Sequence, residues 1–241
     1  MLLALTLVAG SVDAISYLGL GHVFTAMMTG NTVLLGLALA QGELLAALRS
    51  VLALLGFAIG VFVGATIVER ESEPKEWPAA VTAALGVEAL ILAFFSASWY
   101  ASPVARTAGI TYLLILLLAL AMGIQSAAVR RLGVPGIATT YITGTLTSLM
   151  VDLLGWLRLL AARLPTPQPL GNSPKRLPSI PWEQRVGLLA GVIVLYCLGA
   201  LIGGVAQAQA APVATLLPPF ILMLVVLNAA IRQHHDPRAS R

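Results

Sequence analysis

The chain is built from long apolar stretches separated by short polar breaks. A helix needs roughly 20 apolar residues to cross about 30 Å of hydrocarbon. Strands of an outer-membrane barrel would instead alternate apolar and polar residues over short segments, and this chain shows no such alternation. The pattern therefore predicts membrane helices. The candidate stretches are Leu2–Leu20, Val23–Ala40, Leu48–Val68, Pro78–Ser96, Ala108–Val129, Ile137–Leu157, Val186–Ala206 and Pro212–Ile231.

Two segments are polar enough to be aqueous loops, residues 69–76 and the proline-rich residues 163–185. Neither is long enough for a soluble domain. The first apolar stretch has no basic segment before it and is interrupted by Asp13, unlike a secretory signal peptide. We therefore expect it to be retained as a span.

An internal repeat relates the two halves of the chain. Thr25–Leu35 matches Thr139–Leu149 at a constant offset of 114 residues. Upstream, Gly10–Ala14 resembles Met122–Ser126, which places Asp13 opposite Gln125; downstream, Gly60-x-x-x-Gly64 resembles Gly199-x-x-x-Gly203. We expect two membrane repeats, residues 1–100 and 101–241, the second carrying a cytoplasmic loop at 163–185. A chance match is the alternative for so short a motif.

The basic residues distinguish two topologies. If all eight stretches cross, ten lie inside and four outside; if Val23–Ala40 and Ile137–Leu157 enter and return, twelve lie inside and only Arg49 and Arg106 outside. The positive-inside rule favours the second arrangement. We therefore expect an all-α polytopic membrane protein with about six transmembrane helices and two broken or re-entrant Thr-Gly elements, in a two-fold inverted repeat. Eight full spans is the alternative.

Composition excludes several other classes of protein. Hydrophobic residues make up 59% of the chain and charged residues 10%, against about 45–50% and about 25% in soluble proteins. The low charge excludes disorder, and the single Cys197 excludes a disulfide scaffold. The 14 basic residues are spread along the chain and form no dense patch for nucleic acid.

Several motifs resemble the YoaK-like family of bacterial integral membrane proteins, whose domain has no assigned function. They are Ala9–Ala14, Leu18–Phe24, Met28–Gly36, Gly123–Leu132 and Thr139–Thr147. In that family an Asn is common where Met27 and Ser126 stand, so the resemblance implies no ligand role for these two residues. It implies a multi-pass protein of the bacterial cytoplasmic membrane with about six spans, and it implies no substrate.

Asp13 is the sharpest candidate for chemistry. A carboxylate in mid-span costs about 2.5–3.5 kcal/mol on insertion scales, so it normally faces a cavity, a partner or an ion. Asp13 is a candidate proton or sodium site, or a contact for a cationic group of a substrate. The alternative is a structural carboxyl that holds the first span against Gln125 or a Thr-Gly element. Gln125 would supply an amide at the matching place in the second half.

The two Thr-Gly elements are candidate substrate contacts. Glycine lets a chain bend, and Thr and Asn side chains satisfy backbone groups that a broken helix frees. A half-helix that starts there would point its positive end at an anion. The alternative is a glycine-mediated helix contact with Thr hydroxyls bonded to the preceding turn. The candidates are Thr29, Gly30, Asn31, Thr143, Gly144 and Thr145.

Other polar residues carry weaker signals. Glu88 lies in mid-span and is either a coupling-ion site or a structural hydrogen-bonding group. We expect His22 at the membrane interface, and His234 and His235 in a solvated tail that binds no metal. The glycine ridges around Gly60 and Gly199 would pack helices within the chain or form a homodimer seam.

The sequence contains no enzyme motif and implies no cofactor. We expect a non-enzymatic secondary transporter or permease of a small polar solute or anion, with a midplane site and proton or sodium coupling. Its environment would be the lipid bilayer of a bacterial inner membrane, with both termini in the cytoplasm. A passive channel and a structural or partner-binding membrane protein are the alternatives.

Overall fold

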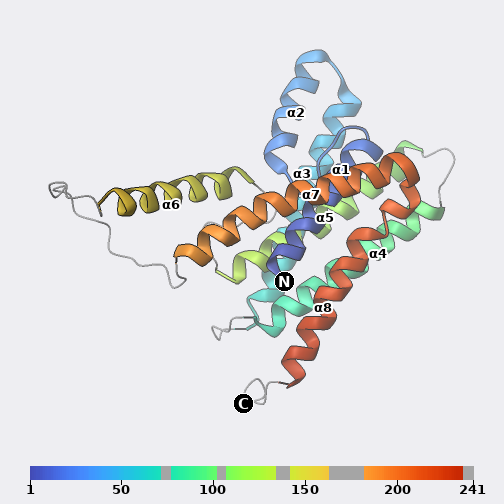
Figure 1. Ribbon diagram of the computed structural model, residues 1–241. Helices are drawn as coiled ribbons and strands as arrows, with labels where there is room; N and C mark the ends of the chain where they lie inside the picture. The colour runs from blue at the N-terminus through green and yellow to red at the C-terminus, as the bar shows by residue number, and fades with distance from the viewer. Residues whose placement is uncertain (72–76, 102–106, 134–141, 163–181, 236–241) are drawn as a thin grey trace.

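The computed structural model describes residues 1–71, 77–101, 107–133, 142–162 and 182–235, and these residues form helices and loops without any strand (Figure 1). Each predicted apolar stretch corresponds to a helix. The helices are α1 (Leu2–Gly19), α2 (Met28–Gln41), α3 (Leu44–Val68), α4 (Ala79–Ala101), α5 (Ala108–Arg131), α6 (Ile142–Ala162), α7 (Trp182–Ala214) and α8 (Leu217–His235). The all-α fold is as predicted.

Six of these helices are long and apolar enough to cross a membrane, namely α1, α3, α4, α5, α7 and α8. The other two are α2 and α6, the helices of the Thr-Gly elements. With 14 residues, α2 is only about 21 Å long, too short for about 30 Å of hydrocarbon. The six candidate spans in the described part agree with the expectation of about six transmembrane helices, and α2 is too short to be a full span.

Contacts between helix ends fix the directions of the spans. Gly19 at the end of α1 lies against the indole of Trp99 at the end of α4, so these helices run the same way. Gln125, near the end of α5, donates to the carbonyl of Leu5, near the start of α1 (Nε2–O 3.1 Å). The first span of the second half is therefore antiparallel to the first span of the first half, as an inverted repeat requires. We call the side where α1 begins the N-terminal face.

Glycines join the halves into two tight helix pairs, α1 with α7 and α3 with α5. A Cβ added at Gly10 would meet the carbonyl of Tyr196, and one added at Gly123 would meet the carbonyl of Phe57. Further glycines of the two pairs make equivalent contacts. Gly199 of α7 lies against Leu7 of α1 as Gly60 of α3 lies against Leu120 of α5, and Gly203 lies against Ser11 as Gly64 lies against Ile124. Each pair takes one helix from each half, so the halves interlock and these ridges pack within the chain.

The glycine contacts also correct the alignment of the two halves. Gly10 and Gly123 occupy equivalent places, which makes Ser126, and not Gln125, the counterpart of Asp13. A shift of one residue turns a side chain by about 100° around a helix. The sequence match left a gap of two residues between the motifs, at offsets of 112 and 114, whereas the glycine contacts set the first offset at 113 and leave a gap of one.

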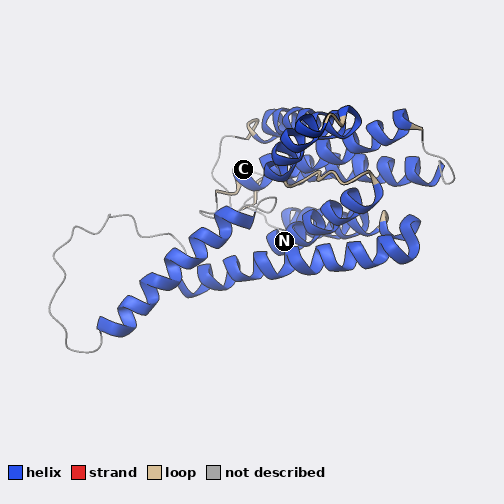
Figure 2. Ribbon diagram, turned by 90° about the horizontal axis from the view of Figure 1, so that it is seen from above, coloured by secondary structure: helices blue, strands red, loops and turns tan. Residues whose placement is uncertain are grey.

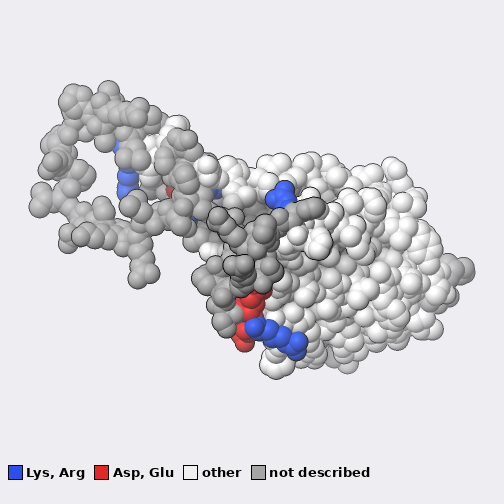
Figure 3. Space-filling view, turned by 90° about the horizontal axis from the view of Figure 1, so that it is seen from below, with Lys and Arg blue, Asp and Glu red and all other residues white. Residues whose placement is uncertain are grey.

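Burial separates central from peripheral helices. In the most apolar 18-residue stretch of each helix, 67% of the residues of α5 and 56% of those of α1 are buried. The corresponding share is 22% in α7 and in α8. The surface carries many exposed large apolar side chains, as a lipid-facing surface should. On the side shown in Figure 3, the charged residues of the described part gather in a few small clusters.

Among the helices, α6 lies at the edge of the bundle and diverges from α7 (Figures 1 and 2). It is the most amphipathic of the described helices. An ion pair between Asp152 and Arg185 (Oδ2–Nε 3.0 Å) ties its middle to the first turns of α7.

A substitution at Gly60 tests the interlocked packing. Gly60→Ala would push a methyl group into the backbone of Leu120, and overpacking of this kind costs about 1–3 kcal/mol. We expect a lower melting temperature in detergent. Gly86→Ala in α4 is the matched control, because no atom lies within 4 Å of a Cβ added there. Equal melting temperatures for the two variants would contradict this packing.

Candidate functional site

The chain turns back into the protein directly after α1. Gly21 and His22 adopt positive φ angles of 86° and 61°, which reverse the chain. The ring of Phe24 then stacks on Tyr17 of α1 at a centroid distance of 4.9 Å. Residues 23–26 run without helical hydrogen bonding to the depth of Asp13, and α2 begins after Met27, whose carbonyl accepts from the N–H of Gly30 (3.2 Å).

Asp13 holds this returning segment. Its Oδ1 accepts hydrogen bonds from the N–H groups of Thr25 (2.9 Å) and Ala26 (2.7 Å), and its Oδ2 accepts one from the N–H of Met27 (3.1 Å). Oδ2 also accepts a hydrogen bond from the hydroxyl of Tyr196 on α7. We call this set of five residues the Asp13 clasp. Four donors occupy a carboxyl group that is only 3% exposed.

Asn31 completes the connection from the side of α2. Its Oδ1 accepts from the N–H of Phe24 (3.0 Å) and its Nδ2 donates to the carbonyl of the same residue (2.6 Å). Gly30 leaves room for the Phe24 ring, because an added Cβ would lie 2.8 Å from it. Thr29 is exposed. The structure therefore brings Asp13, Gly30 and Asn31 together around one loop, and leaves Thr29 outside it.

The second Thr-Gly element occupies the first turn of α6. Thr143 is exposed and its carbonyl accepts from the Thr147 hydroxyl (2.9 Å), Gly144 is half-buried, and Thr145 is fully buried. Within the described residues the hydroxyl of Thr145 has no hydrogen-bond partner. The preceding residues 139–141, which match the clasped segment, lie outside the described part, as do residues 163–181 of the proline-rich loop.

Gln125 does not join Asp13. Its amide reaches Leu5, which lies eight residues, or about 12 Å, from Asp13 along α1. Tyr196, by contrast, is a residue of the clasp that the sequence analysis missed. One signal was available, since Tyr196 is a hydroxyl-bearing residue three positions before Gly199 in an otherwise apolar span.

Glu88 lies apart from the clasp. It is 0% exposed, and within the described residues neither carboxyl oxygen has a hydrogen-bond partner. The two buried acids thus have opposite environments. Four donors surround the carboxyl group of Asp13, and the described part of the chain offers none to Glu88.

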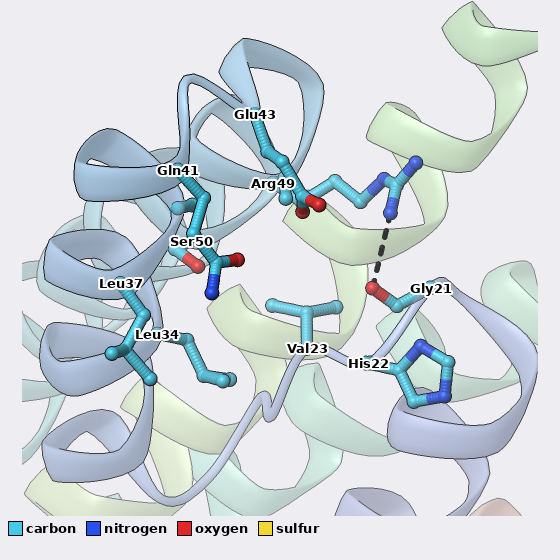
Figure 4. A pocket seen from close by; sticks show the side chains of 11 residues that line it. Gly21, His22, Val23, Leu34, Leu37, Gln41, Glu43, Arg49 and Ser50 are labelled. Carbon is cyan, nitrogen blue, oxygen red and sulfur yellow. Dashed lines mark hydrogen bonds between the residues drawn. The ribbon is translucent and has the colours of Figure 1, made fainter.

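A pocket of about 230 Å³ opens beside the loop on the face opposite the N-terminal face (Figure 4). It lies between α2 and the start of α3. Its polar lining includes His22, Gln41, Glu43, Arg49 and Ser50. Arg49 donates from Nη1 to the carbonyl of Gly21 at 3.1 Å. The loop of residues 20–27 therefore forms one wall of the pocket and is also the segment that Asp13 holds.

Two variants test the contribution of the clasp to stability. Asp13→Asn replaces one acceptor oxygen with an NH₂ group that faces other donors. Hydrogen bonds to charged groups contribute about 1.5–3 kcal/mol each, so we expect a clear drop in melting temperature. Tyr196→Phe removes one donor of four and should give a smaller drop. Tyr17→Phe is the control, because its ring contacts do not involve the hydroxyl. If Tyr196→Phe melts like this control, the bond to Asp13 contributes nothing.

Comparisons with known proteins agree with the resemblance seen in the sequence. A family model described as "Protein of unknown function (DUF1275)" matches residues 1–229. The chain is 38% identical over 233 residues to the UPF0700 transmembrane protein YoaK of Bacillus subtilis (strain 168), with 96% of this chain and 94% of the relative covered. No solved structure matches. The chain therefore belongs to the DUF1275 family, which includes the YoaK membrane protein.

Proposed function

We propose that this protein is a secondary transporter of a small polar solute, and not an enzyme. One observation carries the proposal: after α1 the chain re-enters the protein and begins the half-helix α2 at the depth of Asp13, beside a polar pocket. Non-helical backbone at membrane depth is tolerated only where it is buried in protein or lines a cavity. Broken helices at a repeat interface are a recurring feature of transporter binding sites.

The pocket supports a small solute. Sites for drug-sized ligands have volumes of about 300–1,000 Å³, and this pocket has about 230 Å³. Its lining carries both a guanidinium, from Arg49, and a carboxyl, from Glu43. The fork of an arginine suits a carboxylate or another planar anion. We assign the pocket as the entry site for a solute with an anionic group.

The interlocked pairs define the parts that would move. The pair of α1 and α7 and the pair of α3 and α5 each have close glycine contacts, which resist separation. Between the pairs, α1 and α5 make far fewer contacts, and a hydrogen bond joins them from Gln125 of α5 to the carbonyl of Leu5 of α1 (3.1 Å). Rocking of one pair against the other would open the interior alternately to each side. In this description Asp13 positions α2 and does not bind the coupling ion.

Charge gives the orientation that we propose. Among the described residues, Arg70, Arg130, Arg131 and Arg232 lie toward the N-terminal face, and Arg49 lies on the opposite face. The positive-inside rule places the side that is richer in basic residues in the cytoplasm. We therefore propose a bacterial inner-membrane protein with cytoplasmic termini and a pocket that opens outward.

Cysteine labelling tests this orientation. In a Cys197→Ala background, Glu43→Cys and Arg70→Cys provide two matched exposed positions on opposite faces. We expect a membrane-impermeant maleimide to label position 43 on intact cells and position 70 only after permeabilisation. Labelling of both positions on intact cells would contradict the six-span orientation.

A binding screen followed by a flux assay tests transport. Purified protein is heated with single amino acids, small carboxylates and inorganic anions, and a ligand at 100 times its Kd should add about 2.7 kcal/mol of stability. The stabilising compound should then show saturable uptake into proteoliposomes.

Arg49→Gln should raise the half-saturating concentration for uptake at least ten-fold. Arg232→Gln, which changes an exposed arginine far from the pocket, should leave this concentration unchanged. Uptake that rises linearly without saturation would indicate a channel, and no stabilising compound would count against the entry site.

A further inference from the structure

Glu88 occupies the centre of the buried face of α4. The buried residues of this helix recur every three or four positions and form a single stripe: Val81, Ala84, Leu85, Glu88, Ala89, Leu92, Phe95, Ser96 and Trp99. Glu88 is the one acid in the stripe and is flanked by Leu85, Ala89 and Leu92. It lies ten residues into a helix of 23 residues, and thus near the middle of the span.

The helices that pack against α4 offer it no charge partner within the described residues. These helices are α3, α5, α7 and α8. Their charged side chains lie toward the ends: Arg49 on α3, Arg130 and Arg131 on α5, Arg185 on α7, and Arg232 with His234 on α8. Their other titratable groups are Tyr112 near the start of α5, Tyr196, which is bonded to Asp13, and the exposed Cys197.

An ionised carboxylate cannot stay in such a place at low cost. Mid-membrane acids cost about 2.5–3.5 kcal/mol even on insertion scales, and a buried charge without a partner costs about 3–5 kcal/mol. Metal cations are held by several oxygen ligands at once, and no group of three or more His, Cys, Asp or Glu side chains gathers in the described residues. A proton neutralises Glu88 without any further ligand.

We propose that Glu88 is the proton-binding group that couples transport to the proton gradient. This inference rests on the transport function proposed above. In the state described here the side chain is a neutral carboxylic acid. When the pairs rock apart and water reaches α4, the O–H bond breaks, one proton passes to water and a carboxylate remains. The carboxylate must regain one proton before the helices can close around it again.

The contrast with Asp13 explains why the structure favours Glu88. Binding a proton at Asp13 would require one of the three N–H groups or the phenol to give up its lone pair on the carboxyl group. Glu88 gives up no hydrogen bond with residues of the described part when it changes its protonation state. Only the access of water limits its titration.

Infrared spectroscopy of the protein in proteoliposomes tests the proton site without any solute. A protonated carboxylic acid gives a C=O stretching band that is separate from the carboxylate bands. We expect this band in neutral buffer, and its loss in alkaline buffer as the proton leaves. Glu88→Gln should remove it, whereas the control Glu43→Gln, at an exposed acid, should leave it unchanged. An unchanged band in Glu88→Gln, or a band that never responds to alkaline buffer, would overturn the inference.

A stability measurement distinguishes this role from a structural one. Glu88→Leu removes a buried polar group that has no partner in the described residues, so we expect it to melt at or above the wild-type temperature. A structural hydrogen bond would instead give a clear loss. Uptake driven by a proton gradient should be abolished in Glu88→Gln, while exchange of the same solute across the vesicle membrane continues. If the wild type shows no uptake, the transport proposal fails, whereas the infrared band still reports on the proton site.

Discussion

The fold depends on how the backbone of residues 23–27 is satisfied at membrane depth. Each unbonded peptide group in hydrocarbon costs several kcal/mol, and the N–H groups of this segment form no helical bonds. Asp13 accepts from three of its N–H groups, and Asn31 binds both backbone groups of Phe24. The carboxyl group also lies at the start of α2, which is the positive end of the helix. The same interaction fixes where α2 begins, and thereby where the pocket between α2 and α3 can form.

Close helix crossings place the two ends of that interaction within reach of each other. Asp13 and Tyr196 are 183 residues apart in sequence. They meet because Gly10 and Gly199 let α1 and α7 approach until backbone touches backbone. A bulkier residue at either glycine would separate the phenol from the carboxyl. The glycine ridge therefore contributes to the clasp through backbone packing, because Gly10 lies directly against the backbone of Tyr196.

Much of this fold follows from local features of the sequence, because the length of an apolar stretch and the positions of the basic residues can be read directly along the chain. Apolar length predicted the helices, and the distribution of arginines favoured six crossings over eight. Asp13 was recognised as costly in mid-span for the same reason.

The partners of Asp13 depend on helix crossings between distant segments, which a single sequence does not specify, so Tyr196 was missed. The counterpart in the second half was misplaced by one residue, at Gln125, because only the contacts of Gly10 and Gly123 set the register. Glu88 was noticed, but its spacing left its face undetermined until the buried stripe of α4 was known.

The corrected register shows that the two helix pairs are not chemically equal. At the places that Asp13 and Tyr196 occupy in the pair of α1 and α7, the pair of α3 and α5 carries Ser126 and Phe57. Neither an acid nor a phenol stands there, so the carboxylate contact that holds the first element cannot be repeated at these two positions. An inverted repeat with identical halves would have two states of equal free energy, related by a two-fold axis in the membrane plane. A clasp in only one of the two helix pairs removes this equality and stabilises the state in which Asp13 holds residues 25–27. The opposite state must then be populated by binding energy or by a change of charge elsewhere, and Glu88 is a buried acid whose charge can change without breaking that clasp.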